Sequence, residues 1–230
     1  MIPYSGYKIF FREEFQVYKL IAFDFDGTLA DSVDFCLGVF DLVFAKHLGE
    51  NAPDREDIYQ NFGMNEAGVI KHYMGSIDQT AVNDFNRWHR ELHAEMCPET
   101  FPGVLEFLKY LKSRGVRLTI LTGRSEETCK ISMDFLKLNE YFESFQTGSS
   151  ERNDKAGQLR KLLAENNLAP EELAYVGDAV SDAQSSINAG VDCLSAAWAK
   201  SARVAELEKI NPGKVFTTVK AMQEYLSSKI

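Results

Sequence analysis

The chain has 230 residues, of which 45% are hydrophobic and 26% charged, a balance typical of soluble globular proteins that excludes a disordered or fibrous one. Its 34 acidic and 25 basic side chains give a formal net charge of -9, which opposes binding to nucleic acid. The four cysteines form no C-x-x-C pair and no apolar run is long enough to span a bilayer, so we expect a reduced, cytoplasmic protein without a zinc ribbon, disulfide framework or membrane segment.

Residues 1–18 come before the first convincing strand and are interpreted as an N-terminal extension. Acidic residues interrupt this stretch where a signal peptide needs a continuous apolar run, which argues against secretion. A docked extra element, an extended tail and a start codon placed too early all remain open for it.

The next part of the chain predicts one strand followed by helices only. Residues 19–25 form a short apolar run that ends at an Asp-Gly turn, as a buried strand does. Asp31 and Ser32 are expected to cap a helix over 33–48 that is apolar on most sides. Apolar residues recurring every three or four positions then predict helices over 55–62, 66–74 and about 81–96.

From Phe101 onward, helices and strands alternate. Helices are expected over 104–113, 126–136, 154–166 and 182–189, with strands over 116–121, 144–147, 173–176 and 191–195 and two short elements after them. Strands separated by single helices form a parallel sheet with helices on both faces and ligands at the carboxyl ends of the strands. The predicted fold is therefore α/β, a Rossmann-like core of residues 19–32 and 99–230 with a smaller all-helical cap over 33–98.

Two carboxylates stand at the end of the first predicted strand. Asp24 and Asp26 alternate with phenylalanines, so the period of two in a strand directs both toward the same face. Concentrated negative charge of this kind is relieved by a cation or by a shared proton, and Mg²⁺ is a cation that prefers oxygen ligands. Taken alone, the pair is also compatible with a strand that simply ends in an Asp-Gly turn.

A second acidic cluster follows the strand predicted over 173–176. Asp178 comes directly after Gly177, with Ser181 and Asp182 at the start of the next helix. Because the strand ends of a parallel sheet converge on one edge, Asp178 can meet Asp24 and Asp26 around a single metal ion. On its own this cluster is equally compatible with a helix start that favours acids.

Three further residues offer phosphate ligands at the same edge. Thr122 and Gly123 end the strand predicted over 116–121 and supply a hydroxyl and backbone N–H groups. Lys155 begins a later helix and supplies a positive charge. A plain turn and a solvated surface lysine are the structural alternatives.

In this order, the motifs DFDGT (24–28), Thr122, Lys155 and GDAVSD (177–182) resemble those of the haloacid dehalogenase-like superfamily across nearly the whole chain. Asp31-Ser32 before a helical insertion, and FPG at 101–103 after it, are similar to the group that contains phosphoglycolate phosphatases and β-phosphoglucomutases. The chain departs from that group at Ala156, where proline is frequent, at Arg124 and in its long leading segment.

The resemblance implies a mechanism and a role for each motif. Asp24 would attack phosphorus to form an aspartyl phosphate, and Asp26 would protonate the leaving group and then deprotonate the attacking water. Mg²⁺ would be held by Asp24, Asp178 and the backbone carbonyl of Asp26, while Thr122, Gly123 and Lys155 would hold the transferred oxygens. Asp182 would support a metal-bound water or Lys155. Ser181 would either support the site from outside or only cap its helix.

These observations predict a magnesium-dependent phosphatase that acts on a small phosphorylated metabolite. The alternatives are a phosphomutase of the β-phosphoglucomutase type and a catalytically idle binding protein on the same fold. The dehalogenases of the superfamily lack an acid two residues after the nucleophile, so Asp26 argues against a dehalogenase. Substrate choice is expected to lie in the cap, whose polar candidates are Asn65, Lys71, His72, Arg87, His89 and Arg90. His89 and His93 have the i, i+4 spacing of a metal pair, but no acid or cysteine pattern supports one.

Overall fold

A computed structural model describes residues 18–151 and 154–230 of the chain. Its strands are β1 (Leu20–Phe23), β2 (Arg117–Leu121), β3 (Ser144–Gln146), β4 (Leu173–Gly177), β5 (Asp192–Ala196) and β6 (Val215–Phe216). Its first α-helices are α1 (Val33–Leu48), α2 (Arg55–Gln60), α3 (Glu66–Met74), α4 (Gln79–Met96) and α5 (Val104–Ser113). The others are α6 (Glu126–Phe135), α7 (Lys155–Asn166), α8 (Val180–Ala189), α9 (Val204–Ile210) and α10 (Val219–Leu226). Short 3₁₀ turns occur at Gly49–Asn51 and Pro170–Glu172.

In the part of the chain that the structure describes, the six strands form one parallel sheet in the order β3-β2-β1-β4-β5-β6. The first strand, β1, lies in the middle of the sheet. Strands β2 and β3 follow in order on one side of it, and the chain then crosses back to place β4 on the other side of β1. The carboxyl ends of β1 and β4 therefore lie side by side where the direction of winding reverses. In open α/β sheets, this reversal point is where ligands bind.

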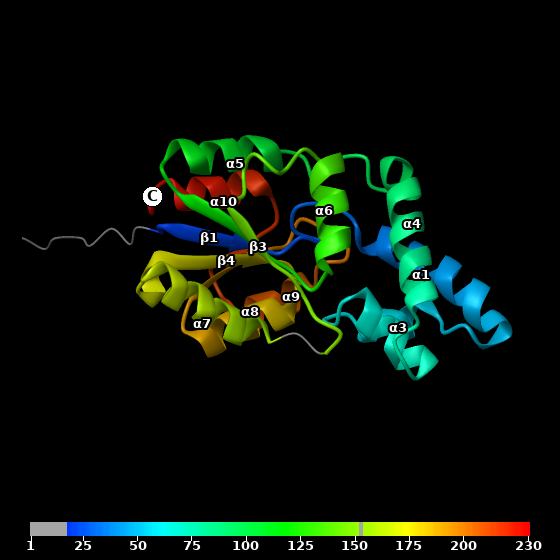
Figure 1. Cartoon of the computed structure of the whole chain (residues 1–230). Helices are drawn as coiled ribbons and strands as arrows, with labels where there is room; N and C mark the ends of the chain where they lie inside the picture. The colour runs from blue at the N-terminus through cyan, green and yellow to red at the C-terminus, as the bar shows by residue number, and fades with distance from the viewer. Residues whose placement is uncertain (1–17, 152–153) are drawn as a thin grey trace, which may run out of the picture.

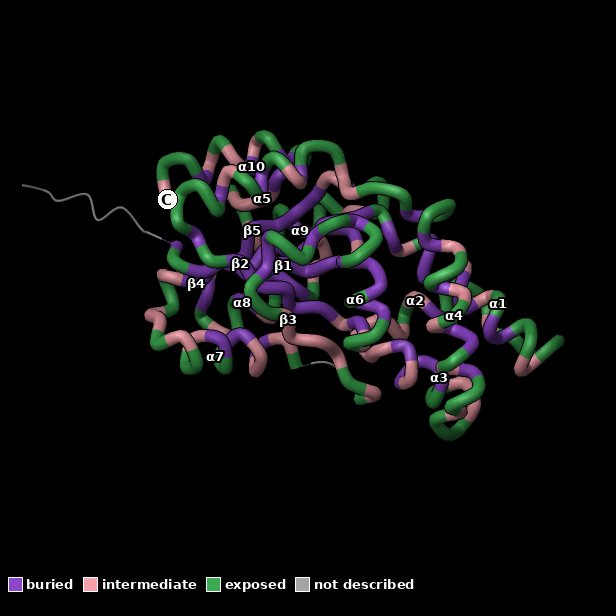
Figure 2. Tube along the Cα trace, turned by 45° about the horizontal axis from the view of Figure 1, so that its top comes forward, coloured by how far each residue is buried: buried purple, intermediate pink, exposed green. Residues whose placement is uncertain are grey.

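Helices cover both faces of the sheet (Figure 1). Helices α5 and α10 lie on one face, and α7, α8 and α9 lie on the other. Figure 2 shows buried residues concentrated along the strands, with exposed ones on the outer sides of the helices. Strands β1 and β4 are buried along their whole length, as expected for a sheet covered on both sides.

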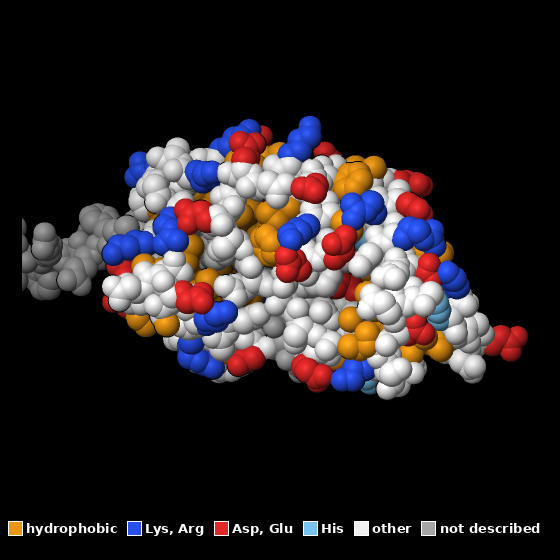
Figure 3. Space-filling model, viewed as in Figure 1, with side chains coloured by type: hydrophobic (Ala, Val, Ile, Leu, Met, Phe, Trp, Pro, Cys, Tyr) orange, Lys and Arg blue, Asp and Glu red, His pale blue; other side chains and the backbone are white. Residues whose placement is uncertain are grey.

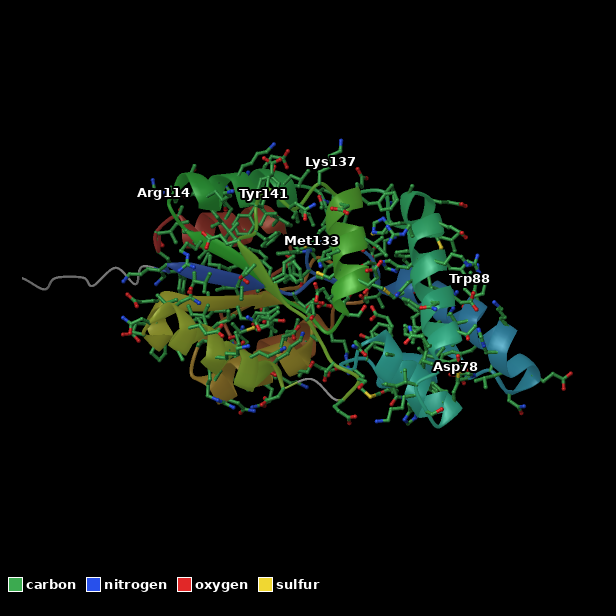
Figure 4. All side chains as sticks on the ribbon, viewed as in Figure 1. Asp78, Trp88, Arg114, Met133, Lys137 and Tyr141 are labelled. Atoms are coloured by element: carbon green, nitrogen blue, oxygen red, sulfur yellow. The ribbon has the colours of Figure 1, made fainter. Side chains whose placement is uncertain are left out.

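Helices α1 to α4, here called the helical segment (residues 33–96), lie together beyond the carboxyl end of the sheet (Figure 1). Helix α1 packs on α4, where the rings of Phe40 and Phe85 have centroids 4.5 Å apart. Helix α4 also packs on α6 of the sheet-containing part. Trp88 lies on the side of α4 away from α6 (Figure 4). The guanidinium of Arg87 and the ammonium of Lys46 lie over its ring.

The predicted fold class is confirmed, and the bounds predicted for 33–48, 66–74 and 104–113 agree with α1, α3 and α5. Other predicted details differ from the structure. Ser32 is the N-cap residue of α1, as predicted, but its side chain accepts no hydrogen bond from the helix and its hydroxyl donates to Asp26 instead. Helix α8 begins at Val180, two residues early, with Ala179 as its N-cap. Three elements, α9, β6 and α10, replace the two expected at the end of the chain.

Residues 1–17 of the predicted extension lie outside the described residues. Tyr18 belongs to the folded part, because its ring is 1% exposed and its hydroxyl donates to Asp192 at 2.5 Å. None of the helices in the described ranges combines the length and the apolar character that a membrane span requires. Acidic and basic side chains are interspersed over the face shown in Figure 3.

Candidate active site

Asp24 and Asp178 meet at the reversal point of the sheet, directly after β1 and β4. The Asp24 N–H donates to the carbonyl of Val176 at 2.8 Å, which continues the pairing of the two strands to the edge of the sheet. The turn after β1 needs glycine at position 27, where φ is +72° and a Cβ atom would lie 2.2 Å from Oδ2 of Asp178. The Asp-Gly turn therefore makes room for the second acid.

Lys155 connects two of the acids. Its Nζ donates to Oδ2 of Asp24 and to Oδ1 of Asp182, in both cases at 2.6 Å. Asp182 is fully buried and also accepts from the Ala179 N–H at 3.0 Å. The Lys155 side chain, at the start of α7, is only 14% exposed. The structure thus brings Lys155 into the acidic cluster, unlike the solvated surface lysine that was its alternative.

The charges in this cluster are only partly balanced. Burial raises the pKa of Asp24 to about 6, although the positive charge of Lys155 opposes the shift. Burial also raises the pKa of Asp178 well above its usual range, and the negative charges of Asp182 and Asp24 add to the effect. Three buried or half-buried carboxylates thus share one ammonium group.

This donor set fits a hard divalent cation. One carboxylate oxygen each from Asp24, Asp178 and Asp182 can be chosen so that all three lie within 4.8 Å of one another. Oxygen-rich, negatively charged clusters of this kind suit Mg²⁺. The sequence placed Asp24 and Asp178 in this set, and the structure adds the carboxylate of Asp182.

The carboxylate of Asp26 turns away from this cluster toward Arg124. The Arg124 guanidinium donates to it twice, from Nε at 2.9 Å and from Nη2 at 2.6 Å, and the Ser32 hydroxyl donates to it at 2.6 Å. Burial alone would raise the pKa of Asp26, but the Arg124 charge outweighs it and lowers that pKa to about 2. Of the two side chains in this pair, that of Arg124 is buried, because the residue is only 4% exposed. Paired carboxylate and guanidinium groups are strong, directional contacts.

Arg124 also connects the sheet edge to α4. Its Nη1 donates to the Ser132 hydroxyl at 2.6 Å, and the same hydroxyl contacts Nε2 of His89 and His93 at 3.1 and 2.9 Å. Both imidazoles are essentially unexposed and pack on the ring of Phe35. The structure thus assigns the two histidines to a buried contact between α4 and α6, and not to a metal site.

These histidines predict a pH-dependent loss of stability. Burial and the Arg124 charge lower the pKa of His93 to about 4, below the ordinary value of about 6.5 that it regains on unfolding. Below pH 6.5 the unfolded chain binds the extra proton, so the free energy of unfolding falls as pH falls toward 4. Between pH 7 and 5.5 we expect His93 to account for about 1 kcal/mol of that loss.

Urea unfolding of the native protein and of His93→Gln at the two pH values measures this contribution. The variant should lose about 1 kcal/mol less than the native protein, and His72→Gln, which changes an exposed histidine, should behave as native. Equal losses in the native protein and in His93→Gln would show that His93 is not held neutral in the fold.

The acids open into a cavity of about 470 Å³ between the edge of the sheet and the helical segment. Asp24, Asp26, Asp178 and Lys155 line it, as do Gly123, Ser181 and Arg124. Thr122 precedes Gly123 and is fully buried, and its Oγ1 accepts from the Arg124 N–H at 3.3 Å. Ser181 is exposed inside α8, so it is not the cap of that helix.

The polar candidates of the helical segment do not line this cavity. Lys71, Arg87 and Arg90 pair at the surface with Glu151, Asp84 and Glu127. Asn65 caps α3 and contacts the 148–149 loop, His72 is exposed, and His89 is buried against Ser132. The surface that faces the acids is built from other side chains of the segment, which sequence reasoning did not single out.

Comparison with known proteins agrees with this geometry. The model of the family described as haloacid dehalogenase-like hydrolase matches residues 21–196. Pyrophosphatase PpaX of Bacillus mycoides is 26% identical, with 90% of this chain and 96% of that protein covered. Phosphoglycolate phosphatase 1 of Pseudomonas aeruginosa is 27% identical, with 77% of this chain and 68% of that protein covered.

Solved structures show the same fold. A haloacid dehalogenase-like hydrolase of Streptococcus pneumoniae superposes with a TM-score of 0.71 at 23% identity, covering 91% of this chain and 98% of that one. CbbY of Rhodobacter sphaeroides, solved in complex with phosphate, superposes with a TM-score of 0.65 at 21% identity. The match covers 77% of this chain and 85% of that one. On the match to the family model, the chain belongs to the haloacid dehalogenase-like hydrolases.

Proposed function

We propose that this protein is a Mg²⁺-dependent phosphatase that hydrolyses a small phosphorylated metabolite through an aspartyl phosphate on Asp24. The observation that carries the proposal is the placement of Asp24 at the base of the cavity, where Lys155 and two further acids surround it. A carboxylate held in this way can attack phosphorus and be released again by water. The names of the relatives as phosphatases support this reaction class.

Asp24 is held ready for attack by two donors. The Phe25 N–H donates to Oδ1 at 2.8 Å and Lys155 donates to Oδ2 at 2.6 Å. Lys155 would also offset the negative charge of the transferred phosphoryl group, with the Thr122 hydroxyl and the Gly123 N–H as further donors. Preformed donors of this kind cost no reorganisation when charge develops.

Asp26, protonated when the bound substrate takes over part of its pairing with Arg124, would supply that proton to the leaving oxygen and then take one back from the attacking water. In the present arrangement both its oxygens accept from Arg124 and one also accepts from Ser32. We therefore expect Asp26 to exchange part of its pairing with Arg124 for the substrate when the substrate binds. Arg124 would otherwise keep this carboxylate ionised and oriented.

The proposed Mg²⁺ ligands are carboxylate oxygens of Asp24, Asp178 and Asp182 and the backbone carbonyl of Asp26. Mg²⁺ bound there would offset the repulsion between a carboxylate nucleophile and a dianionic phosphate ester. Asp182 would at the same time position Lys155, to which it is paired. Ser181, at the exposed edge of the cavity, would contact substrate or solvent.

The helical segment, together with residues 97–98, is proposed to be a cap, inserted over residues 33–98 into a core of residues 19–32 and 99–230. Helix α3 reaches the core through the carboxylate of Glu66, which accepts from the Ser125 N–H at 2.9 Å and from the Thr128 hydroxyl. Such contacts can close a lid over a site and exclude water. A catalytically idle protein is disfavoured, because the acids and Lys155 are all present and converge.

A phosphate-release assay with Mg²⁺ present tests the proposed function. Sugar phosphates, phosphorylated small acids, nucleotides and pyrophosphate should include at least one substrate, and chelation with EDTA should abolish turnover until Mg²⁺ is restored. A phosphomutase would instead convert one sugar phosphate to another without releasing phosphate. Full activity after exhaustive metal removal would contradict the role given to the acid cluster.

A further inference from the structure

The side of the cavity formed by the helical segment is mostly apolar. Its lining includes the half-buried Val33, Tyr59, Phe62 and Met64 and the buried Phe40 and Phe85, with Gln60 and Glu66 as polar members. The four aromatic rings form a continuous group, with centroid separations of 4.5 Å for Phe40–Phe85, 6.3 Å for Phe40–Phe62 and 5.4 Å for Tyr59–Phe62. Contiguous rings of this kind favour contact with a flat or bulky carbon skeleton.

The apolar side chains lie next to the position expected for phosphate. Phe62 and Met64 flank Gly63, and a Cβ atom on Gly123 would lie 3.9 Å from the Gly63 Cα. The backbone of this loop therefore approaches the end of β2, at which Gly123 is a candidate phosphate donor. In a bound phosphate ester whose phosphorus faces Asp24, the alcohol part that will leave would extend toward Phe62 and Met64.

Most of the cations around the cavity are buried and paired, and among its described lining residues Arg203 is the largely exposed one. Among its described lining residues, the helical segment contributes no lysine, arginine or histidine and only one acid, Glu66. The remaining cations are Lys155, paired with Asp24 and Asp182, Arg124, paired with Asp26, and Arg203, at the sheet side with Glu206. A carboxylate or second phosphate on a leaving group that packs against Phe62 and Met64 would thus meet apolar side chains and Glu66, which penalises its binding.

We propose that the substrate is the phosphate monoester of an uncharged, apolar alcohol or phenol. This inference rests on the phosphatase function proposed above and narrows its substrate class. It separates this chain from an enzyme for phosphoglycolate or pyrophosphate, whose leaving groups carry negative charge. The ring or alkyl part of the alcohol packs against Phe62 and Met64, while the phosphoryl group faces Asp24 and Lys155.

The test compares kcat/KM for benzyl phosphate, methyl phosphate, 2-phosphoglycolate and pyrophosphate with Mg²⁺ and the full chain. Benzyl phosphate, methyl phosphate and 2-phosphoglycolate all release an alkoxide. The differences between their kcat/KM values therefore report mainly on how the pocket binds each leaving group. Benzyl phosphate should exceed methyl phosphate and 2-phosphoglycolate by about tenfold or more, the size of effect that a hydrophobic pocket gives. Pyrophosphate should be a poorer substrate still.

Two cavity variants and one control locate the effect. Phe62→Ala should lower kcat/KM for benzyl phosphate by about tenfold and leave methyl phosphate within about twofold. Met64→Lys should lower the value for benzyl phosphate and raise that for 2-phosphoglycolate. Leu42→Ala, which removes an exposed leucine of α1 away from the cavity, should match the native enzyme for every ester. Circular dichroism and thermal melting confirm that each variant is folded.

The outcomes separate this inference from the proposed function. Phosphate release with a preference for 2-phosphoglycolate or pyrophosphate over benzyl phosphate would overturn the apolar substrate class and leave the phosphatase in place. A Phe62→Ala variant that loses activity equally on benzyl and methyl esters would also overturn it. No phosphate release from any of the four by folded protein with Mg²⁺, or from the wider phosphate-ester panel, would contradict the phosphatase proposal itself.

Discussion

Replacing Asp24 with asparagine should abolish phosphate release. The substitution keeps the size of the side chain and an oxygen that can accept from the Phe25 N–H, but it removes the carboxylate that attacks phosphorus. Loss of a catalytic nucleophile lowers turnover by roughly 10⁴-fold or more, so release should fall to the background of the assay. Steady-state phosphate release on the best available ester measures the change.

The fold should tolerate Asp24→Asn. Asp24 lies in a cluster where carboxylates outnumber ammonium groups, so neutralising one of them relieves repulsion. We expect a melting temperature equal to or above that of the native protein, and Asp31→Asn, which changes an exposed acid outside the cavity, should keep full activity. A folded Asp24→Asn protein with near-native turnover would exclude Asp24 as the nucleophile.

Replacing Lys155 with alanine should lower turnover by about 10²- to 10³-fold, the usual effect of removing one preorganised group that stabilises charge in the transition state. The change should also reduce stability, because Asp182 is fully buried and loses the partner that donates at 2.6 Å. Turnover must therefore be measured at a temperature where urea or thermal unfolding shows the variant to be folded.

A second lysine on the same helix gives the matched control. Lys161 lies on α7 with its side chain 59% exposed and, within the described part of the chain, forms an ion pair with Glu165 alone, at 3.6 Å. Lys161→Ala should leave turnover unchanged. It should change the free energy of unfolding by no more than a few tenths of a kcal/mol. Native turnover in folded Lys155→Ala would show that Lys155 only balances buried charge.

The elements with clear local signals were predictable from the sequence. Helix α1 follows a turn and carries apolar residues along most of its length, α3 starts at a capping asparagine and α5 has a strong apolar face. Alternation of strands and helices was enough to predict the parallel sheet, and its convergent strand ends placed Asp24 and Asp178 together. Periodicity and topology rules therefore located the centre of the site.

Contacts between distant segments were not predictable in the same way. Arg124 pairs with Asp26, 98 residues earlier, and no local pattern distinguishes this arginine from a solvated one. Its position directly after the end of β2 was the one available signal, because strand ends converge. His89 and His93 have the spacing of metal ligands, yet their common partner is Ser132 on α6.

Weak local signals account for the errors at the end of the chain. Strand β6 has only two residues, so it carries no alternation by which a strand is recognised, and pairing with β5 defines it. The side chains with which the helical segment lines the cavity were missed for a different reason. Polar residues were expected to set specificity, whereas Phe62 and Met64 line the cavity and the polar candidates pair at the surface or pack elsewhere.

Acid-quench mass spectrometry during turnover tests the central claim, covalent catalysis by Asp24, most directly. The full chain with Mg²⁺ and its best ester is quenched at successive times, alongside Asp26→Asn, in which loss of the proposed base should slow hydrolysis of the intermediate. We expect protein heavier by one phosphoryl group, with the group on the peptide that contains Asp24 and at higher occupancy in the variant. A phosphoryl group on another residue, or phosphate release from Asp24→Asn at the native rate, would contradict it.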